Sequence, residues 1–411
     1  VDISVIDDAV RRILKVKFDM GLFDDPFSYC DPEREKEWVY HQDHQQTVLD
    51  MARKSIVLLK NETKLLPLSR GRQKVAVIGA LAQDNNSPLG SWRISSDDST
   101  AVTLKEGIDP YGAEVTYAKG ADLITGPATF LYNVPINEND KSGFKEAVRI
   151  ARRSDVVVMV LGEHGFQSGE GRSRTQLDLP GVQQELLEEV FKVNKNIVLV
   201  LMNGRPLAIP WAAENIPTIL ETWHLGSQSG HAIAQVLFGE YNPSGKLPMS
   251  FPRSVGQVPI AYNKYNTGRP VPQDIVFWST YTDEAIDPQF AFGHGLSYTT
   301  FDYSDLAIEV TGTNEVLVRA KVTNSGDLGG EEVAQLYLRD LVASVVRPVK
   351  ELKGFEKFHL GPGQSKIVEF RLSEKELGFF DGLGNFQLEP GKFQVMVGTS
   401  SVQGLTGEFE L

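Results

Sequence analysis

The sequence has 411 residues, 41% hydrophobic and 23% charged, which is the balance of water-soluble globular proteins and enough chain for two or three domains. A formal net charge of -13 without a cluster of Lys and Arg argues against binding nucleic acid or anionic lipid, and no run of about 18 apolar residues predicts a membrane span. The single cysteine, Cys30, cannot form an internal disulfide and lacks a second thiolate for a structural metal site, so the sequence predicts no cofactor and no metal.

Residues 4–20 carry apolar side chains at helical spacing, which predicts one amphipathic helix. Ser4 and Asp7 have the spacing of a capping box at its start, and Gly21 would end it. The sequence begins at Val1 with neither an initiator Met nor the features of an export signal. We therefore expect the natural start, and the neighbours of this helix, to lie upstream.

Between Lys74 and about Pro252, short apolar runs alternate with segments of helical periodicity, which predicts a largely parallel sheet covered by helices on both faces. The predicted strands are KVAVIGALA, VTYAKGA, DVVVMVLGE, NIVLVLMNG and PTILETWHL, and the predicted helices span 141–153, 181–193 and 229–238. Ligands of such sheets bind at the carboxyl ends of the strands. The loop after the run that ends at Gly162 is one such end.

Residues 253–300 are rich in Pro, Tyr, Thr and Asp without a long period, which is typical of a packed linker. Beyond Phe301 the pattern changes to alternation of period two between turns, as in NEVLVRAKVTNSG and GKFQVMVGTS. This pattern is typical of a small antiparallel β-sandwich. The expected fold class is therefore α/β followed by all-β.

The loop after Gly162 contains two carboxylates, Glu163 and Glu170, together with His164 and two arginines. Paired carboxyls are what glycoside cleavage requires. Glu163 directly follows the strand, so hydrogen bonding to the loop is favoured for it. Glu170 lies between Gly169 and Gly171, which allow the backbone to swing its carboxyl away from the sheet, although spacing alone leaves open a merely solvated loop.

Other chemistries are less well supported. GEGRS lacks the lysine of a phosphate-binding loop, and SGEG is not the elbow of a serine hydrolase. His41 and His44 have no third metal ligand, so a solvated helix face is favoured. Trp92, in GSW, could stack on a sugar, although a core position is the commoner place for an indole.

Several motifs together resemble glycoside hydrolase family 3, most closely its bacterial periplasmic β-glucosidases, over nearly the whole chain. The resemblance rests on ILKVKFDMGLFDDPFS, ARKSIVLLKNE, LVLMNGRPLAI, ETWHLGSQSGHAIAQVLFGEYNPSGKLPMSFPRSVGQVP, FGHGLSYTTF and RPVKELKGFEKF. It implies a (β/α)8 barrel, an α/β sandwich and a fibronectin type III-like β-sandwich. Residues 1–25 would close the barrel, 26–60 form a linker and lead-in helix, 61–252 the α/β sandwich, 253–300 a linker, and 301–411 the fibronectin type III-like domain.

The resemblance also implies a mechanism. Family members retain configuration, with a barrel Asp as nucleophile and a Glu from the α/β sandwich as general acid/base. SGEGRSR matches the segment that carries this Glu, which implies the role for Glu170, with Glu163 as the alternative. GSW resembles the segment that supplies an aromatic wall for the leaving group, which implies substrate binding by Trp92. No residue of this chain matches the nucleophile, so we expect it upstream of Val1.

These implications lead to the expected function, a retaining exo-acting β-glucosidase that removes terminal non-reducing β-D-glucosyl residues. The expected partners are small β-glucosides or oligosaccharides and the protein's own N-terminal barrel, with no nucleic acid or membrane, and the expected location is the periplasm or outside the cell. A β-xylosidase and a non-catalytic carbohydrate-binding or scaffold fragment remain as alternatives. The oligomeric state, including a homodimer, stays open.

Overall fold

The structure, a computed structural model, describes residues 1–71, 73–93, 99–269 and 277–411. These residues form two compact units, 1–47 and 48–411. Among the described residues, no helix is both long enough and apolar enough to cross a membrane.

The first unit is helical. It contains α1 (Ile3–Asp19), α2 (Pro32–Trp38) and the start of α3 (Gln42–Ser55). The helix predicted over 4–20 is therefore present, but its cap differs from the predicted Ser4 and Asp7 capping box: the carboxylate of Asp2 accepts a hydrogen bond from the backbone N of Ser4 at 2.8 Å. Asp2 takes this role because its carboxylate precedes the first turn, where backbone N–H groups lack partners.

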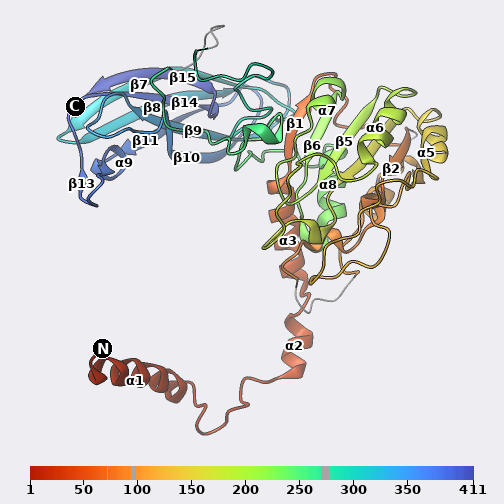
Figure 1. Cartoon of the computed structure of the whole chain (residues 1–411), viewed down its shortest axis with the longest axis horizontal. Helices are drawn as coiled ribbons and strands as arrows, with labels where there is room; N and C mark the ends of the chain where they lie inside the picture. The colour runs from red at the N-terminus through yellow and green to blue at the C-terminus, as the bar shows by residue number, and fades with distance from the viewer. Residues whose placement is uncertain (72, 94–98, 270–276) are drawn as a thin grey trace. The chain divides into compact units, whose positions relative to one another are not determined.

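The second unit begins with a six-stranded sheet in the order β1-β6-β5-β4-β2-β3 (Figure 1). Its strands are β1 (Val57–Asn61), β2 (Lys74–Ile78), β3 (Glu114–Ala118), β4 (Val156–Gly162), β5 (Ile197–Met202) and β6 (Thr218–Glu221). All neighbouring pairs are parallel except β1 with β6. The predicted parallel sheet is thus confirmed, with one antiparallel edge strand added.

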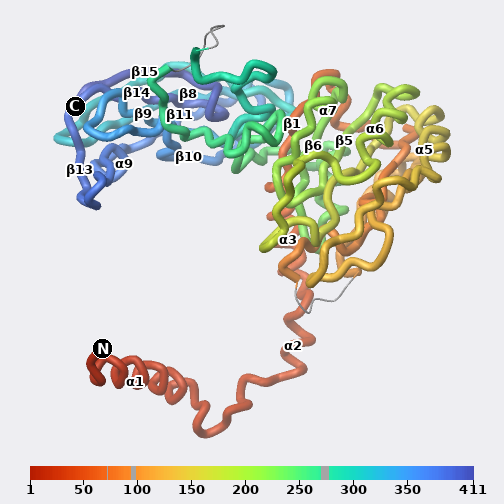
Figure 2. Tube along the Cα trace, viewed as in Figure 1, coloured from red at the N-terminus to blue at the C-terminus, as the bar shows by residue number. Residues whose placement is uncertain are grey.

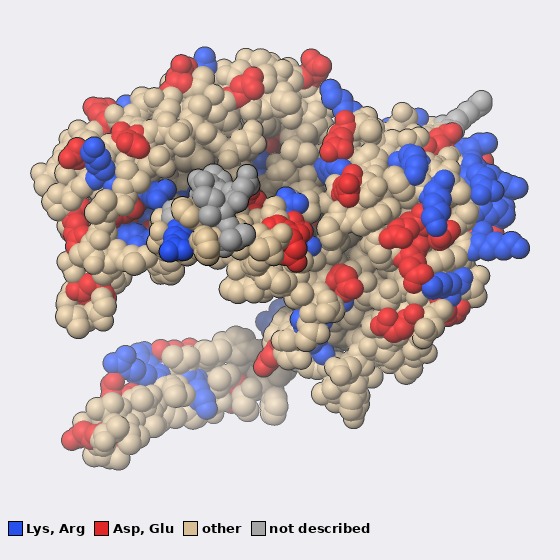
Figure 3. Space-filling view, turned by 45° about the horizontal axis from the view of Figure 1, so that its top comes forward, with Lys and Arg blue, Asp and Glu red and all other residues tan. Residues whose placement is uncertain are grey.

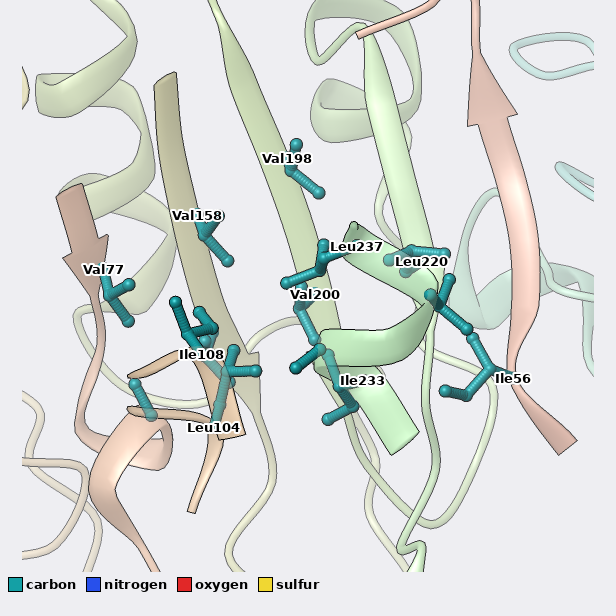
Figure 4. Packing of buried hydrophobic residues seen from close by; sticks show 14 of the residues in the cluster. Ile56, Val77, Leu104, Ile108, Val158, Val198, Val200, Leu220, Ile233 and Leu237 are labelled. Atoms are coloured by element: carbon teal, nitrogen blue, oxygen red, sulfur yellow. The ribbon is translucent and has the colours of Figure 1, made fainter. Parts of the chain in front are cut away.

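Helices cover both faces of this sheet, as the sequence pattern predicts. They are α4 (Leu104–Ile108), α5 (Phe144–Ala151), α6 (Gln183–Phe191), α7 (Pro210–Asn215) and α8 (Ser229–Leu237). Because successive side chains of a strand point to opposite faces, Val158 of β4 joins the core with α4 and α8, whereas Met159 joins the core with α5, α6 and α7. Figure 4 shows the first of these layers, with Ile233 and Leu237 of α8 against the strands. Two buried faces explain why the strands read as continuous apolar runs.

The segment before the predicted α/β domain contributes to its sheet. Strand β1 spans Val57–Asn61, so all but its last residue lie in the segment 26–60, which was predicted to be a linker and lead-in helix. The expected linker 253–300 also contacts the sheet domain, through β-bridges of Phe251 with Phe290 and of Leu58 with Leu296. Residues 270–276 of that linker lie outside the described part of the chain.

The C-terminal part is an all-β domain, coloured from blue-green to blue in Figure 2. Two sheets, ordered β10-β9-β14-β15 and β11-β8-β7, contribute side chains to one apolar core. The elements are β7 (Phe301–Gly312), β8 (Glu315–Asn324), β9 (Gly330–Asp340), β10 (Glu351–Leu360), β11 (Ser365–Leu372), α9 (Glu374–Leu377), β12 (Phe379–Phe380), β13 (Phe386–Gln387), β14 (Lys392–Ser400) and β15 (Gln403–Glu410). The predicted β-sandwich is confirmed.

Charged side chains of both signs lie scattered over the face drawn in Figure 3, most of which belongs to other residues. The formal net charge of -13 is therefore not gathered into one acidic field on that face.

Candidate active site

The order of the strands switches direction between β2 and β4. The chain passes from β2 to β3 on one side and then to β4 on the other side of β2, so the two loops that follow β2 and β4 leave the sheet side by side. Such a switch in strand order is where parallel α/β sheets bind ligands. The loop after β2 leads to Trp92, and the loop after β4 contains Glu163 and Glu170. A hydrogen bond of 3.1 Å from the backbone N of Gly165 to the Ser87 hydroxyl joins the two loops.

Glu163 lies at the buried foot of the loop after β4. Its side chain is inaccessible to solvent, and its carboxylate forms ion pairs with Arg174 at 3.1 Å and with Arg205 at 3.0 Å. The backbone N of Gly204 also donates to this carboxylate, at 3.4 Å. Two arginines offset the cost of burying the charge. This environment suits an anchor of the loop and not a group that meets substrate.

The same two arginines hold both ends of the exposed part of the loop. Arg205 donates a hydrogen bond to the backbone O of Gln167, just before that part begins. Arg174, just after it, donates to the backbone O of Asp178 at 3.1 Å and pairs with the Asp178 carboxylate at 3.2 Å. Because both arginines contact Glu163, one buried carboxylate fixes both ends of residues 169–173.

Glu170 is exposed at the tip of this loop. Its neighbours Gly169 and Gly171 have φ angles of +120° and +71°, in the region that favours glycine. A Cβ atom on Gly169 would lie 2.3 Å from the hydroxyl of Ser91, so the side chain of Ser91 packs closely against the backbone of Gly169. Since Ser91 precedes Trp92, the structure brings the segments of Glu170 and Trp92 together.

Trp92 does not occupy a core position, because 68% of its surface is exposed. The next residue, Arg93, contacts the loop after β4, because its guanidinium lies 4.5 Å from the ring centroid of Phe166. Cation–π contacts of this kind stabilise the approach of two segments. The exposed indole therefore stands on an anchored backbone beside the Glu170 loop.

Three further titratable groups lie close to the two loops: His164, which the sequence places in the loop after β4, and His224 and Glu221, for which the sequence predicted no role. Burial lowers the pKa of His224 to about 4, a shift that His164 reinforces and Asp84 opposes. Burial also lowers the pKa of His164. For Glu221, burial raises the pKa to about 8, with hydrogen bonds from Trp223 and Asn203 acting in the opposite direction.

A positional signal could have identified these groups. His164 follows the end of β4, Asn203 follows β5, and Glu221 ends β6 just before His224. The carboxyl ends of parallel strands meet at one edge of a sheet, so polar residues at several strand ends are expected to cluster. Among the described residues, no group of three or more His, Cys, Asp or Glu side chains could hold a metal ion.

The described residues form a mostly parallel α/β domain and a β-sandwich, with a carboxylate and an indole exposed on neighbouring loops where the strand order switches. This combination is the one expected of the glycoside hydrolases that the sequence motifs resemble. Residues 56–298 match the glycosyl hydrolase family 3 C-terminal domain, and residues 332–401 match a fibronectin type III-like domain. The chain belongs to glycoside hydrolase family 3.

Similar proteins include enzymes with two named activities. The chain is 42% identical to the periplasmic β-glucosidase of Salmonella typhimurium, over 100% of this chain and 56% of that protein. It is 41% identical to a β-xylosidase of Formosa agariphila, over 96% of this chain and 54% of that protein. The β-glucosidase of Listeria innocua has a similar structure, with a TM-score of 0.89 at 33% identity over 100% of this chain and 56% of that one. The chain spans about half the length of the curated relatives it matches.

Proposed function

We propose that this chain is the part of a retaining exo-acting β-glucosidase that supplies the general acid/base, Glu170, and the leaving-group wall, Trp92. The nucleophilic Asp belongs to a barrel domain outside this chain. The substrates are small β-glucosides or oligosaccharides, and the enzyme works in the periplasm or outside the cell, a location supported by the periplasmic relative.

The observation that carries this proposal is the contrast between the two glutamates of one loop. A group that protonates the leaving oxygen must reach it, and Glu170 is exposed at a tip adjoining the segment of Trp92. Glu163, the alternative, is buried and held by two arginines. We therefore favour Glu170.

In the proposed mechanism, Glu170 donates its proton to the glycosidic oxygen while the Asp attacks the anomeric carbon, and the leaving group departs as an alcohol. The resulting carboxylate then takes a proton from water, which attacks the glycosyl-enzyme and restores the Asp. Retaining enzymes hold these two carboxyls about 5 to 5.5 Å apart. The indole of Trp92 would stack on the apolar face of the departing sugar.

The test uses Glu170→Ala in a protein that joins this chain to the N-terminal part its relatives possess. Hydrolysis of cellobiose should fall about 100- to 10,000-fold, because a sugar alkoxide cannot leave without a proton. Glycosyl transfer from a dinitrophenyl glucoside should persist, and azide should accelerate turnover by attacking the glycosyl-enzyme without base help. Equal loss for all substrates without formation of a glycosyl azide would reject the role of Glu170.

The matched control is Glu163→Ala in the same protein. It should lower stability without selecting among leaving groups. Leaving-group dependence in this variant, together with its absence in Glu170→Ala, would transfer the acid/base role to Glu163.

A β-xylosidase is the second candidate, because the Formosa agariphila relative is nearly as similar as the β-glucosidase. The ratio of kcat/KM for aryl β-glucosides and aryl β-xylosides, measured in the joined protein, decides between them. A non-catalytic carbohydrate-binding fragment is tested by the same assays. Under the proposal, this chain by itself has little activity and the joined protein is active. If both proteins are inactive but bind oligosaccharide, the non-catalytic carbohydrate-binding function is favoured.

A further inference from the structure

A histidine that no part of the proposed mechanism uses lies under both loops of the site. His224 follows β6, and a Cβ atom on Gly90 would lie 3.4 Å from its Nδ1 atom. Gly90 has a φ of +72° and leads directly into Ser91 and Trp92. The imidazole of His224 therefore packs against the turn at Gly90 that precedes Trp92.

The neighbouring ring atom, Cε1, faces Gly204, a glycine that also lies against the loop of Glu170. A Cβ atom on Gly204 would lie 3.6 Å from Cε1 of His224 and 1.9 Å from the hydroxyl of Ser168. Ser168 is buried and lies two residues before Glu170. His224 and Ser168 thus pack against the same glycine. The ring is next to Gly90 of the loop after β2, and Gly204 alone separates it from Ser168 of the loop after β4.

The two loops also contact each other directly. The close approach of Gly169 to Ser91 joins the residue before Glu170 to the residue before Trp92. Three glycines without Cβ atoms therefore surround this region, and each allows backbone and side chain to approach more closely than any other residue would. The size of the side chain at position 224 consequently affects the spacing of both loops.

The imidazole also has an unusual hydrogen-bond state. Its Nε2 atom is buried and has no hydrogen-bond partner among the described residues. A buried polar atom without a partner costs roughly 1–3 kcal/mol, so an apolar ring or chain would be the more stable choice if packing were its only role. His164 and Asp84 are the titratable groups that act on the ring, and its lowered pKa keeps it neutral above about pH 4.

The geometry points to His224 as a positioning residue that sets the spacing between Trp92 and Glu170, and so the fit of the leaving group between wall and acid. This inference rests on the proposed function. His224 does not touch the substrate; it acts through Gly90 on the indole and through Gly204 and Ser168 on the carboxyl. Misplacement of a catalytic group by about 1 Å can lower a rate on the order of 100-fold, so such a support matters for the reaction.

The first test needs no enzymatic activity. The chain contains five tryptophans, and labelling them with 15N provides their indole N–H signals in NMR spectra, with Trp92→Phe identifying the signal of Trp92. His224→Leu should shift or broaden the Trp92 signal. The matched control is His294→Leu, another partly buried histidine, whose Nε2 lies 2.9 Å from the backbone O of Leu59.

The Trp211 signal reports that each variant is folded, since this indole packs against Phe191 of α6, in the opposite layer of the sheet domain. An unchanged Trp92 signal in a folded His224→Leu variant overturns the inference, as does an equal change in the His294 control. If His224→Leu does not fold, His224→Gln is judged by the same criterion.

The second test uses the joined protein and compares leaving groups. For His224→Leu, kcat/KM for cellobiose should fall about 10- to 100-fold, whereas that for dinitrophenyl glucoside should change less than about 3-fold, because only the first substrate needs a well-placed acid. Equal loss with both substrates overturns the inference. If the parent protein hydrolyses neither substrate, the proposed function fails, and the NMR result still decides whether His224 positions Trp92.

Discussion

The foot and the tip of the loop after β4 each carry a glutamate, and the two have opposite surroundings. Glu163 is inaccessible to solvent and paired with two arginines, whereas Glu170 is exposed between two glycines of positive φ. The foot has the properties of a structural anchor, and the tip has those of a group that can reach a ligand. Proximity to a strand end is therefore not enough to make a carboxylate a candidate for catalysis; its exposure and its partners decide whether it can meet a ligand.

The largest expected effect on stability comes from replacing Glu163, at the start of the loop. Glu163→Ala should lower the free energy of unfolding by about 3–5 kcal/mol, because Arg174 and Arg205 would remain as partly buried charges without their shared partner. Urea unfolding followed by circular dichroism measures this loss. Glu170→Ala, the control at the tip, should change stability by less than about 0.5 kcal/mol. Equal stabilities of the two variants would contradict the assignment of Glu163 as a structural anchor and of Glu170 as an exposed group without such a role.

A second carboxylate near the foot, Glu221, should make stability depend on pH. Its pKa of about 8 exceeds the ordinary value of 4.5, so the folded protein binds more protons than the unfolded chain between these values, and this group's contribution falls as pH rises from about 5 to 8. Glu221→Gln removes the titration. As pH rises over that range, the unfolding free energy of the parent protein should therefore fall relative to that of the Glu221→Gln variant. A difference independent of pH would contradict the raised pKa.

The two glycines beside Glu170 should differ from each other. Gly169→Ala should cost about 2–3 kcal/mol, because its Cβ would meet the Ser91 hydroxyl and its φ of +120° is unfavourable for alanine. Gly171→Ala should cost only about 1 kcal/mol, since no atom lies within 4 Å of its Cβ position and only the backbone angle opposes it. Thermal or urea unfolding of the pair measures the contrast. A greater loss for Gly171→Ala would show that the loop does not pack on Ser91.

Trp92 should give the smallest effect on stability. Because 68% of its surface is exposed, Trp92→Ala should change the unfolding free energy by less than about 0.5 kcal/mol. In the joined protein, the same change should reduce kcat/KM for disaccharides more than for aryl glucosides with good leaving groups, if the indole forms the leaving-group wall. A large loss of stability with uniform loss of activity would instead indicate a packing role.

Several features of the fold were predictable from local patterns, and others were not. The strands of the parallel sheet were recognisable because burial on both faces demands continuous apolar runs. β1 was not separated from the segment before it, because a run as short as Val57–Asn61 directly after a helix has no period of its own. The cap of α1 was predicted wrongly, since several short polar residues near a helix start compete and only geometry selects Asp2.

For the site, the glycines flanking Glu170, the GSW segment and the family motifs are local or linear properties of the sequence. They lead to the prediction that Glu170 and Trp92 act in one site, which stays a prediction. The groups that surround these two residues depend on contacts made in the folded chain. Strand order places β2 beside β4, and with them the two loops, while His224 reaches the same place from β6. The physical reason is that burial and pairing depend on contacts between segments far apart in the chain, which no local pattern of residues encodes.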